Sequence, residues 1–232
     1  MVKQPDTQEE GYVQIKSGQI ILHGNLLTPD HAEGLVAFAH GSGSSRHSPR
    51  NQYVARLLRD AGLATLLFDL LTLEEEAEDL ISGKMRFDIP LLGRRLIGTT
   101  DWLQFSDKTR HFRLGFFGAS TGAAAALLAA AERPELVGAV VSRGGRPDLA
   151  APVLDRVKAP TLLIVGGNDM PVIDMNRQAL SKLRTEKELV IVPGATHLFE
   201  EPGALERVAG LSIDWFKRHL VRDQPGYIKQ EE

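Results

Sequence analysis

The chain alternates short, continuously apolar runs with longer stretches of helical periodicity. The apolar runs are GLVAFAH, LATLLFD, RLGFFG, LVGAVVS, PTLLIVGG and KELVIVPG. Runs of this kind indicate strands that are covered on both faces, and their alternation with helices predicts a mainly parallel sheet. The stretch GYVQIKSGQIILHGNLLTP predicts two further strands joined by a tight turn at KSGQ. The pattern therefore predicts an α/β fold with an eight-stranded sheet and helices on both faces.

The segments between the strands predict a single domain over residues 1–232, with flexible tails over about 1–10 and 222–232. The stretch SPRNQYVARLLRDAG predicts a helix that buries Tyr53, Leu57 and Leu58 and ends at Gly62. An acidic run, EEEAED, follows the fourth strand and is typical of a solvated face or loop, or alternatively of one wall of a substrate pocket. Only RGGRPDLAAPVLDRVKA separates the sixth and seventh strands, so we expect no large lid domain.

Composition narrows the class of protein. The chain has no cysteine, which excludes disulfides, thiolate metal sites and a cysteine nucleophile. A net charge of -3 gives no electrostatic footprint for nucleic acid. The N-terminus MVKQPDTQEE lacks the apolar core of a signal peptide, and no apolar run reaches the ~18 residues of a membrane span. We therefore expect a cytoplasmic protein.

One short motif carries chemistry. Residues 118–122 read Gly-Ala-Ser-Thr-Gly, between a predicted strand and a predicted helix. The pattern G-x-S-x-G in this context is typical of a nucleophile elbow, a strained turn that exposes the serine hydroxyl. Ser120 is the predicted nucleophile. The alternative is a turn of small residues in which Ser120 is an ordinary helix N-cap.

A serine nucleophile needs a general base and an acid that orients it. In this chain order the acid should follow the next-to-last strand and the histidine the last strand. Asp169 in TLLIVGGNDMPV and His197 in LVIVPGATHLFEEPG occupy these places. Their alternative roles are an Asx-turn residue for Asp169 and a surface-loop histidine for His197.

Backbone amides that face the developing oxyanion complete such a site. The amide after the nucleophile belongs to Thr121, and the loop AHGSGSSRHSPRN offers Ser42, with Gly43 as the adjacent option. The alternative is a phosphate-binding glycine loop, but GSGSSR lacks both the Lys of a P-loop and the third glycine of a dinucleotide fingerprint. His40 and His47 are not at the spacing of a metal pair, and we expect no metal.

Four segments together, GLVAFAHGSGSS, GFFGASTG, LLIVGGNDMPV and GATHLFEEPG, resemble the α/β-hydrolase superfamily and, more closely, its dienelactone-hydrolase-like branch. The resemblance implies the α/β-hydrolase fold over nearly the whole chain. Members that open dienelactones are described with a cysteine nucleophile, whereas this chain has Ser120. The segments RFDIPLLGRRL and SRGGRPDL resemble a bacterial subgroup that is sometimes fused to phosphoribosyltransferase domains, and we expect no such fusion here.

Two arginines are candidate substrate ligands. Arg143 follows the sixth strand at the predicted edge of Ser120, and Arg46 follows the oxyanion loop. Guanidinium groups pair well with carboxylates, so these residues favour an anionic ester or lactone. The alternative is structural, with Arg143 paired to Asp148 or Asp69.

The pattern as a whole predicts a serine hydrolase that cleaves carboxylic esters or lactones of small molecules through an acyl-enzyme. A thioesterase or small-peptide hydrolase on the same three residues remains open. The non-enzyme alternative is a hydrolase-fold protein that binds a ligand or partner without turnover. We expect no cofactor, no nucleic-acid or membrane partner, and a monomer or homodimer.

Overall fold

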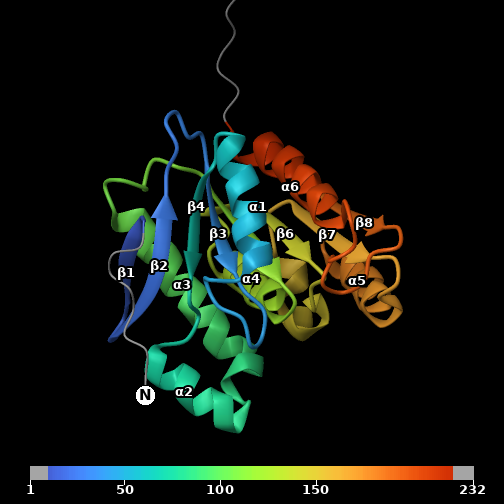
Figure 1. Cartoon of the computed structure of the whole chain (residues 1–232), viewed down its shortest axis with the longest axis horizontal. Coiled ribbons are helices and arrows are strands. Elements are labelled where there is room, and N and C mark those ends of the chain that lie inside the picture. The colour runs from blue at the N-terminus through green and yellow to red at the C-terminus, as the bar shows by residue number, and fades with distance from the viewer. Residues whose placement is uncertain (1–9, 222–232) are drawn as a thin grey trace, which may run out of the picture.

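An eight-stranded sheet forms the centre of the molecule (Figure 1), as the apolar pattern predicts. The computed structural model describes residues 10–221, so nearly all of both predicted tails lies outside the described residues. The strands are β1 (Tyr12–Ser17), β2 (Ile20–Leu27), β3 (Leu35–Ala39), β4 (Ala64–Phe68), β5 (Leu114–Ala119), β6 (Val137–Arg143), β7 (Thr161–Gly166) and β8 (Lys187–Val192).

The strand order is β1-β2-β4-β3-β5-β6-β7-β8. The β1–β2 and β2–β4 pairs are antiparallel, and every other pair is parallel. In the described chain β8 lies at one edge and pairs with β7 alone, and its first two residues, Lys187 and Glu188, are exposed. Parallel strands bring their carboxyl ends to one edge of the sheet, which is where an open α/β sheet places its ligands.

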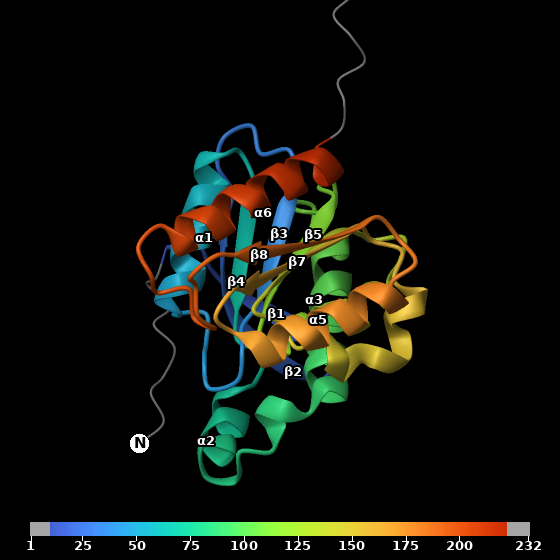
Figure 2. The same ribbon diagram turned by 90° about the vertical axis from the view of Figure 1, so that its right-hand side faces the viewer.

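Helices cover both faces of the sheet (Figure 2). Helices α1 (Pro49–Asp60) and α6 (Ala204–Leu220) pack on one face, where the core includes Phe38, Phe117 and Phe216. The opposite face carries α3 (Ile89–Phe105), α4 (Thr121–Glu132), α5 (Met170–Lys182) and the 3₁₀ segment η2 (Pro147–Arg156). These layers confirm the predicted α/β architecture with helices on both faces.

The predicted apolar face of α1 is right in part. The helix buries Asn51, Val54, Ala55 and Leu58, which follow the i, i+3, i+4, i+7 spacing of one helical face. Leu58 is therefore predicted correctly, and Leu57 is half-buried against the same core. Tyr53 lies beside this face, and its hydroxyl donates a hydrogen bond to Glu206 on α6 at 3.0 Å.

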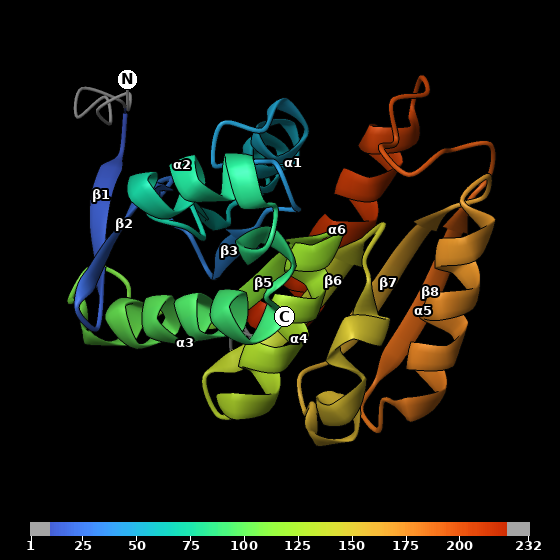
Figure 3. The same cartoon turned by 90° about the horizontal axis from the view of Figure 1, so that it is seen from below.

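The long segment after β4 forms a helix, α2 (Leu73–Ser82), and the short 3₁₀ segment η1 (Met85–Phe87). Helix α2 lies below the sheet in Figure 2, and in Figure 3, seen from below, it lies in front of the sheet between α1 and α3. A capping box fixes its start, because Thr72 Oγ1 accepts from the Glu75 amide while the Glu75 carboxylate accepts from the Thr72 amide. Between β6 and β7 the structure has η2 and no lid domain. None of the described helices is long and apolar enough to cross a bilayer.

Candidate active site

Ser120 lies at the turn between β5 and α4. Its backbone has φ 50° and ψ -122°, and its side chain makes no capping hydrogen bond to α4. The Ser120 hydroxyl therefore does not cap α4, contrary to the alternative in which Ser120 is an ordinary helix N-cap. The flanking glycines are required by space, since a Cβ on Gly118 would lie 2.4 Å from Ala123 Cα and one on Gly122 would lie 2.2 Å from the Ala39 oxygen.

Asp169 and His197 meet beyond the ends of β7 and β8. The distance between Asp169 Oδ2 and His197 Nδ1 is 2.6 Å. Asp169 is the N-cap residue of α5, but its side chain makes no capping hydrogen bond. With Nδ1–H donating to the carboxylate, Nε2 of His197 is the nitrogen left to accept a proton. The pair therefore has the connectivity that a general base and its orienting acid require.

The two loops that carry this pair are bound to each other. Asn168 donates from its backbone amide to the Ala195 oxygen at 2.9 Å and from Nδ2 to the Gly194 oxygen at 2.8 Å. The Thr196 amide donates to Glu201 Oε1 at 3.0 Å, and the hydrogen bonds with Thr196 lower the pKa of Glu201 below its usual range. Hydrogen bonds to residues 194–196 thus hold the chain immediately before His197.

The end of β6 connects Ser120 to His197. The Arg143 oxygen accepts from the Ser120 amide at 3.3 Å. A Cβ on the next residue, Gly144, would lie 3.5 Å from His197 Cε1 and 3.1 Å from its backbone oxygen. The structure therefore brings all three predicted catalytic residues to the same edge of the sheet, on either side of residues 143–144.

The predicted oxyanion loop contacts the elbow directly. A Cβ on Gly41 would lie 3.1 Å from Ser120 Cβ. Among residues 10–221, the amides of Ser42 and Thr121 donate to no acceptor. Gly43 has a positive φ of 69°, which lets the loop turn immediately after Ser42. Both predicted donors are thus available next to the nucleophile.

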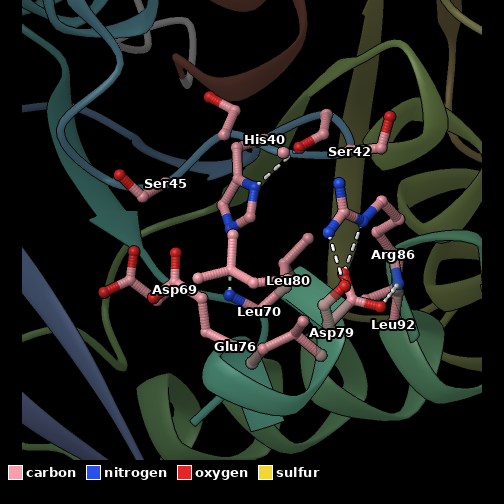
Figure 4. Close-up of a pocket in the computed structure, with 14 residues that line it drawn as sticks. His40, Ser42, Ser45, Asp69, Leu70, Glu76, Asp79, Leu80, Arg86 and Leu92 are labelled. Atoms are coloured by element: carbon pink, nitrogen blue, oxygen red, sulfur yellow. Dashed lines mark hydrogen bonds and ion pairs between the residues drawn. The ribbon is translucent and has the colours of Figure 1, made fainter. Parts of the chain in front are cut away.

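His40 holds this loop in place (Figure 4). Its Nε2 accepts from the Leu70 amide at 3.1 Å, so the proton is on Nδ1, which donates to the Gly41 oxygen at 3.0 Å. The Ser44 amide donates to the same oxygen at 3.2 Å. Because the C=O and N–H of a trans peptide point in opposite directions, the Ser42 amide faces away from His40. Burial lowers the pKa of His40, although the bond to Gly41 acts in the opposite direction.

A pocket of about 550 Å³, including its solvent-open part, begins at the oxyanion loop. Gly41 lines it and also lies against Ser120, so the pocket extends from Ser120. Its apolar walls are Leu70, Leu71, Leu80 and Leu92, and its charged residues are Asp69, Glu76, Asp79 and Arg86. Two members of the acidic run, Glu76 and Asp79, line this pocket, while Glu74 and Glu78 are exposed. Part of the acidic run therefore forms a wall of the pocket, and the rest of it faces solvent, so both predicted alternatives hold.

The two arginines predicted as substrate ligands have different surroundings. Arg46 is buried, its guanidinium forms an ion pair with Asp69, and its Nε donates to Asn25 Oδ1 at 3.1 Å. Arg46 also donates from its backbone amide to Asp69 Oδ1 at 2.8 Å. These bonds tie the loop after the oxyanion residues to the end of β4. The contacts of Arg46 favour a structural role.

Arg143 has neither of the acidic partners proposed for it. Asp69 binds Arg46 and Asp148 binds Arg146, so that part of the structural alternative is wrong. Arg143 instead donates from Nη2 to Asn51 Oδ1 at 3.2 Å, and its Nε is buried without a hydrogen bond. Burial, together with the nearby charge of Arg50, lowers the pKa of Arg143 to about 10.

Sequence reasoning missed the pair formed by Asp79 and Arg86. Asp79 is only 3% exposed and accepts from Arg86 Nε at 2.5 Å and from the Met85 amide at 2.6 Å. Burial acts to raise the pKa of Asp79, but the hydrogen bonds from Arg86 and Met85 bring it below its usual range. No short sequence motif predicts this pair. It forms because the chain turns back after the end of α2 and places Arg86, in η1, beside Asp79.

The strand order, the elbow and the order Ser, Asp, His along the chain define an α/β hydrolase. Residues 29–219 match the model of the dienelactone hydrolase family. The chain belongs to that family.

One solved structure at high identity agrees with this family, and a more distant one shares the fold. The chain is 62% identical to the crystal structure of dienelactone hydrolase from Anabaena variabilis, with a TM-score of 0.90 over 91% of this chain and 98% of that chain. Est1E from Butyrivibrio proteoclasticus shares the fold at 16% identity, with a TM-score of 0.73 over 89% of this chain and 99% of that chain.

Two strains of Mycobacterium tuberculosis have a protein named "Putative phosphoribosyl transferase" that is 55% identical to this chain over 213 residues. The match covers 92% of this chain and 47% of each relative. The chain thus spans about half the length of these curated relatives.

Proposed function

We propose that the protein is a serine hydrolase that cleaves small-molecule carboxylic esters or lactones. The observation that carries this proposal is the 2.6 Å contact between Asp169 and His197 beside a serine on a strained elbow. A histidine oriented in this way, with Nε2 left to accept a proton, is the arrangement that activates a serine hydroxyl.

The proposed reaction has two steps. His197 Nε2 takes the proton of Ser120 as the hydroxyl attacks the ester carbonyl, and the Thr121 and Ser42 amides donate to the oxyanion. His197 then protonates the leaving alcohol, which leaves an acyl group on Ser120. Water, deprotonated by His197, attacks this acyl group, and His197 returns the proton to Ser120 Oγ as the acid leaves. Asp169 keeps the imidazole in the required tautomer and stabilises its charged form throughout.

Hydrolysis of short p-nitrophenyl esters tests this proposal. We expect turnover by the wild type and a loss on the order of 10⁶ in kcat in Ser120→Ala, because the nucleophile is removed. The melting temperature of the variant checks that its fold persists. Turnover that survives in Ser120→Ala would contradict the mechanism. Wild type that neither hydrolyses these esters nor reacts at Ser120 with a fluorophosphonate would favour a protein that binds without turnover.

An anionic ester is a second candidate substrate, and the buried Arg143 is the observation that favours it. Its Nε has no hydrogen-bond partner, and an unpaired buried cation is costly. If this group binds a substrate carboxylate, Arg143→Met should lower kcat/KM about tenfold more for a carboxylated ester than for its neutral match. Equal losses on both esters would leave Arg143 a structural residue.

The name of the M. tuberculosis relatives raises phosphoribosyl transfer as another activity. That name belongs to proteins of which this chain matches 47%. No feature of the site formed by residues 10–221 favours phosphoribosyl transfer, so ester hydrolysis remains the proposal.

A further inference from the structure

The pocket beside Ser120 contains one polar group that is held rigidly and still has a free donor. Arg86 donates from Nε to Asp79 Oδ2 at 2.5 Å and from Nη2 to the Asp79 backbone oxygen at 2.6 Å. The Arg86 amide also donates to Asp79 Oδ1 at 3.2 Å. The two guanidinium bonds to this one buried residue fix the plane and direction of the group, so its remaining nitrogen has a defined place.

That remaining nitrogen, Nη1, faces the oxyanion loop. It lies 3.7 Å from the position that a Cβ would take on Gly43. Among residues 10–221 it donates to no acceptor. Figure 4 shows two nitrogens of Arg86 turned toward Asp79 and the third directed toward the loop that carries Ser42. A substrate bound at Ser120 with one substituent in this pocket would therefore meet an oriented donor at Arg86, apart from the amide of Ser42 that faces the oxyanion.

The charges around the pocket favour a neutral group over an anion. The positive charge of Arg86 is matched by Asp79, and Asp69 is matched by Arg46. The third carboxylate that lines the pocket, Glu76, is exposed, and buried His40 is held neutral. A substrate carboxylate would enter a site whose balance of charge is already neutral to negative, whereas a carbonyl or ether oxygen would meet only the donor.

Leu70, Leu71, Leu80 and Leu92 form the apolar part of the pocket wall. The serines of the oxyanion loop, Ser42, Ser44 and Ser45, line its other side. Ligand pockets generally combine apolar walls with a few placed polar groups that fix orientation. We propose that this pocket binds an uncharged substituent of the ester, apolar except for one acceptor oxygen, and that Arg86 Nη1 donates to that oxygen. The inference rests on the proposed esterase function and names its substrate class.

Two pairs of esters that differ by one oxygen test this assignment. p-Nitrophenyl levulinate and p-nitrophenyl pentanoate differ by a keto oxygen in the acyl group. 2-Methoxyethyl acetate and butyl acetate differ by an ether oxygen in the alcohol. We expect the wild type to prefer the oxygenated ester about 10- to 100-fold in kcat/KM in the pair whose variable group enters the pocket, because a hydrogen bond from a charged donor is gained.

Arg86→Met should reduce this preference to within about twofold, since the donor is lost. Arg110→Met is the matched control, because Arg110 is exposed and pairs with Asp107 away from the pocket; it should keep the wild-type preference. Removal of Arg86 leaves buried Asp79 without its guanidinium. The double variant Arg86→Met/Asp79→Asn therefore repeats the measurement with that charge removed if the single variant fails to fold.

The outcomes separate this inference from the function on which it rests. Wild-type turnover with no preference in either pair, or a preference that persists in Arg86→Met, overturns the assignment and leaves the esterase in place. Faster cleavage of mono-p-nitrophenyl glutarate than of the levulinate ester also overturns it and favours the anionic candidate at Arg143. If the wild type cleaves none of these esters, the proposed esterase function fails and this inference fails with it.

Discussion

At the scale of single residues, local backbone and hydrogen bonding distinguish the proposed site from ordinary loops. Ser120 is one of three non-glycine residues with positive φ in the described chain. Such a conformation costs ~1–3 kcal/mol and persists only where the surroundings impose it. His40 shows the complementary effect, since both of its ring nitrogens are bonded to the backbone around the oxyanion loop. Its neutral state is therefore part of how the loop is held.

The lowered pKa of His40 predicts how stability depends on pH. The unfolded chain takes up a proton near the ordinary histidine pKa of ~6.5, whereas the folded chain does so only at lower pH. Stability should thus be complete above that pH and fall as the pH drops below it, by at most ~1.4 kcal/mol per pH unit from this one group. Urea unfolding between pH 7 and pH 5.5 should show a smaller slope in His40→Gln. Exposed His111→Gln should keep the wild-type slope, and equal slopes in all three proteins would refute the assignment.

At the scale of elements, glycine sets how closely α4 approaches the sheet. Gly118 on β5 faces the backbone of α4, and Gly122 on α4 faces the end of β3. The approach leaves no room for a methyl group on either side. It places the first turn of α4, with its free amides, directly beside the loop that carries Ser42. The nucleophile elbow is therefore a packing arrangement of three elements as well as a turn.

The same substitution should have opposite effects at two glycines. In Gly118→Ala the new methyl would meet backbone atoms of α4, and we expect a loss of about 3 kcal/mol or more in the free energy of unfolding. Gly210 lies inside α6 with no atom within 4 Å of a new Cβ, so Gly210→Ala should gain up to ~1 kcal/mol from helix propensity. Urea denaturation of both variants measures these changes. Similar stability of the two variants would show that the close approach at the elbow is not required.

At the scale of the whole molecule, the sequence predicts the sheet, its layers and the order Ser, Asp, His, because periodicity and the elbow motif are local signals. It predicts only part of the face that α1 buries, since Leu58 is buried while Asn51, Val54 and Ala55 are buried more deeply than Tyr53 and Leu57. It also assigns Arg143 acidic partners that other arginines bind. The ion pair between Asp79 and Arg86 is not predicted from the sequence for the same reason. Ion pairs between side chains of different loops depend on how the helices and strands pack. A single sequence does not show that packing.

The position of β8 at the edge of the sheet has a consequence for how activity responds to stress. His197 follows this strand, which in the described chain pairs with β7 alone among the strands. Edge elements open at lower free energy than the centre of a sheet, in cooperative units that need not include the rest of the fold. Fraying of β8 would carry the proposed base away from Ser120 while β3, β4 and β5 stay paired. We therefore expect mild heat or denaturant to inactivate the protein reversibly before its core melts, with amide exchange rising first along β8.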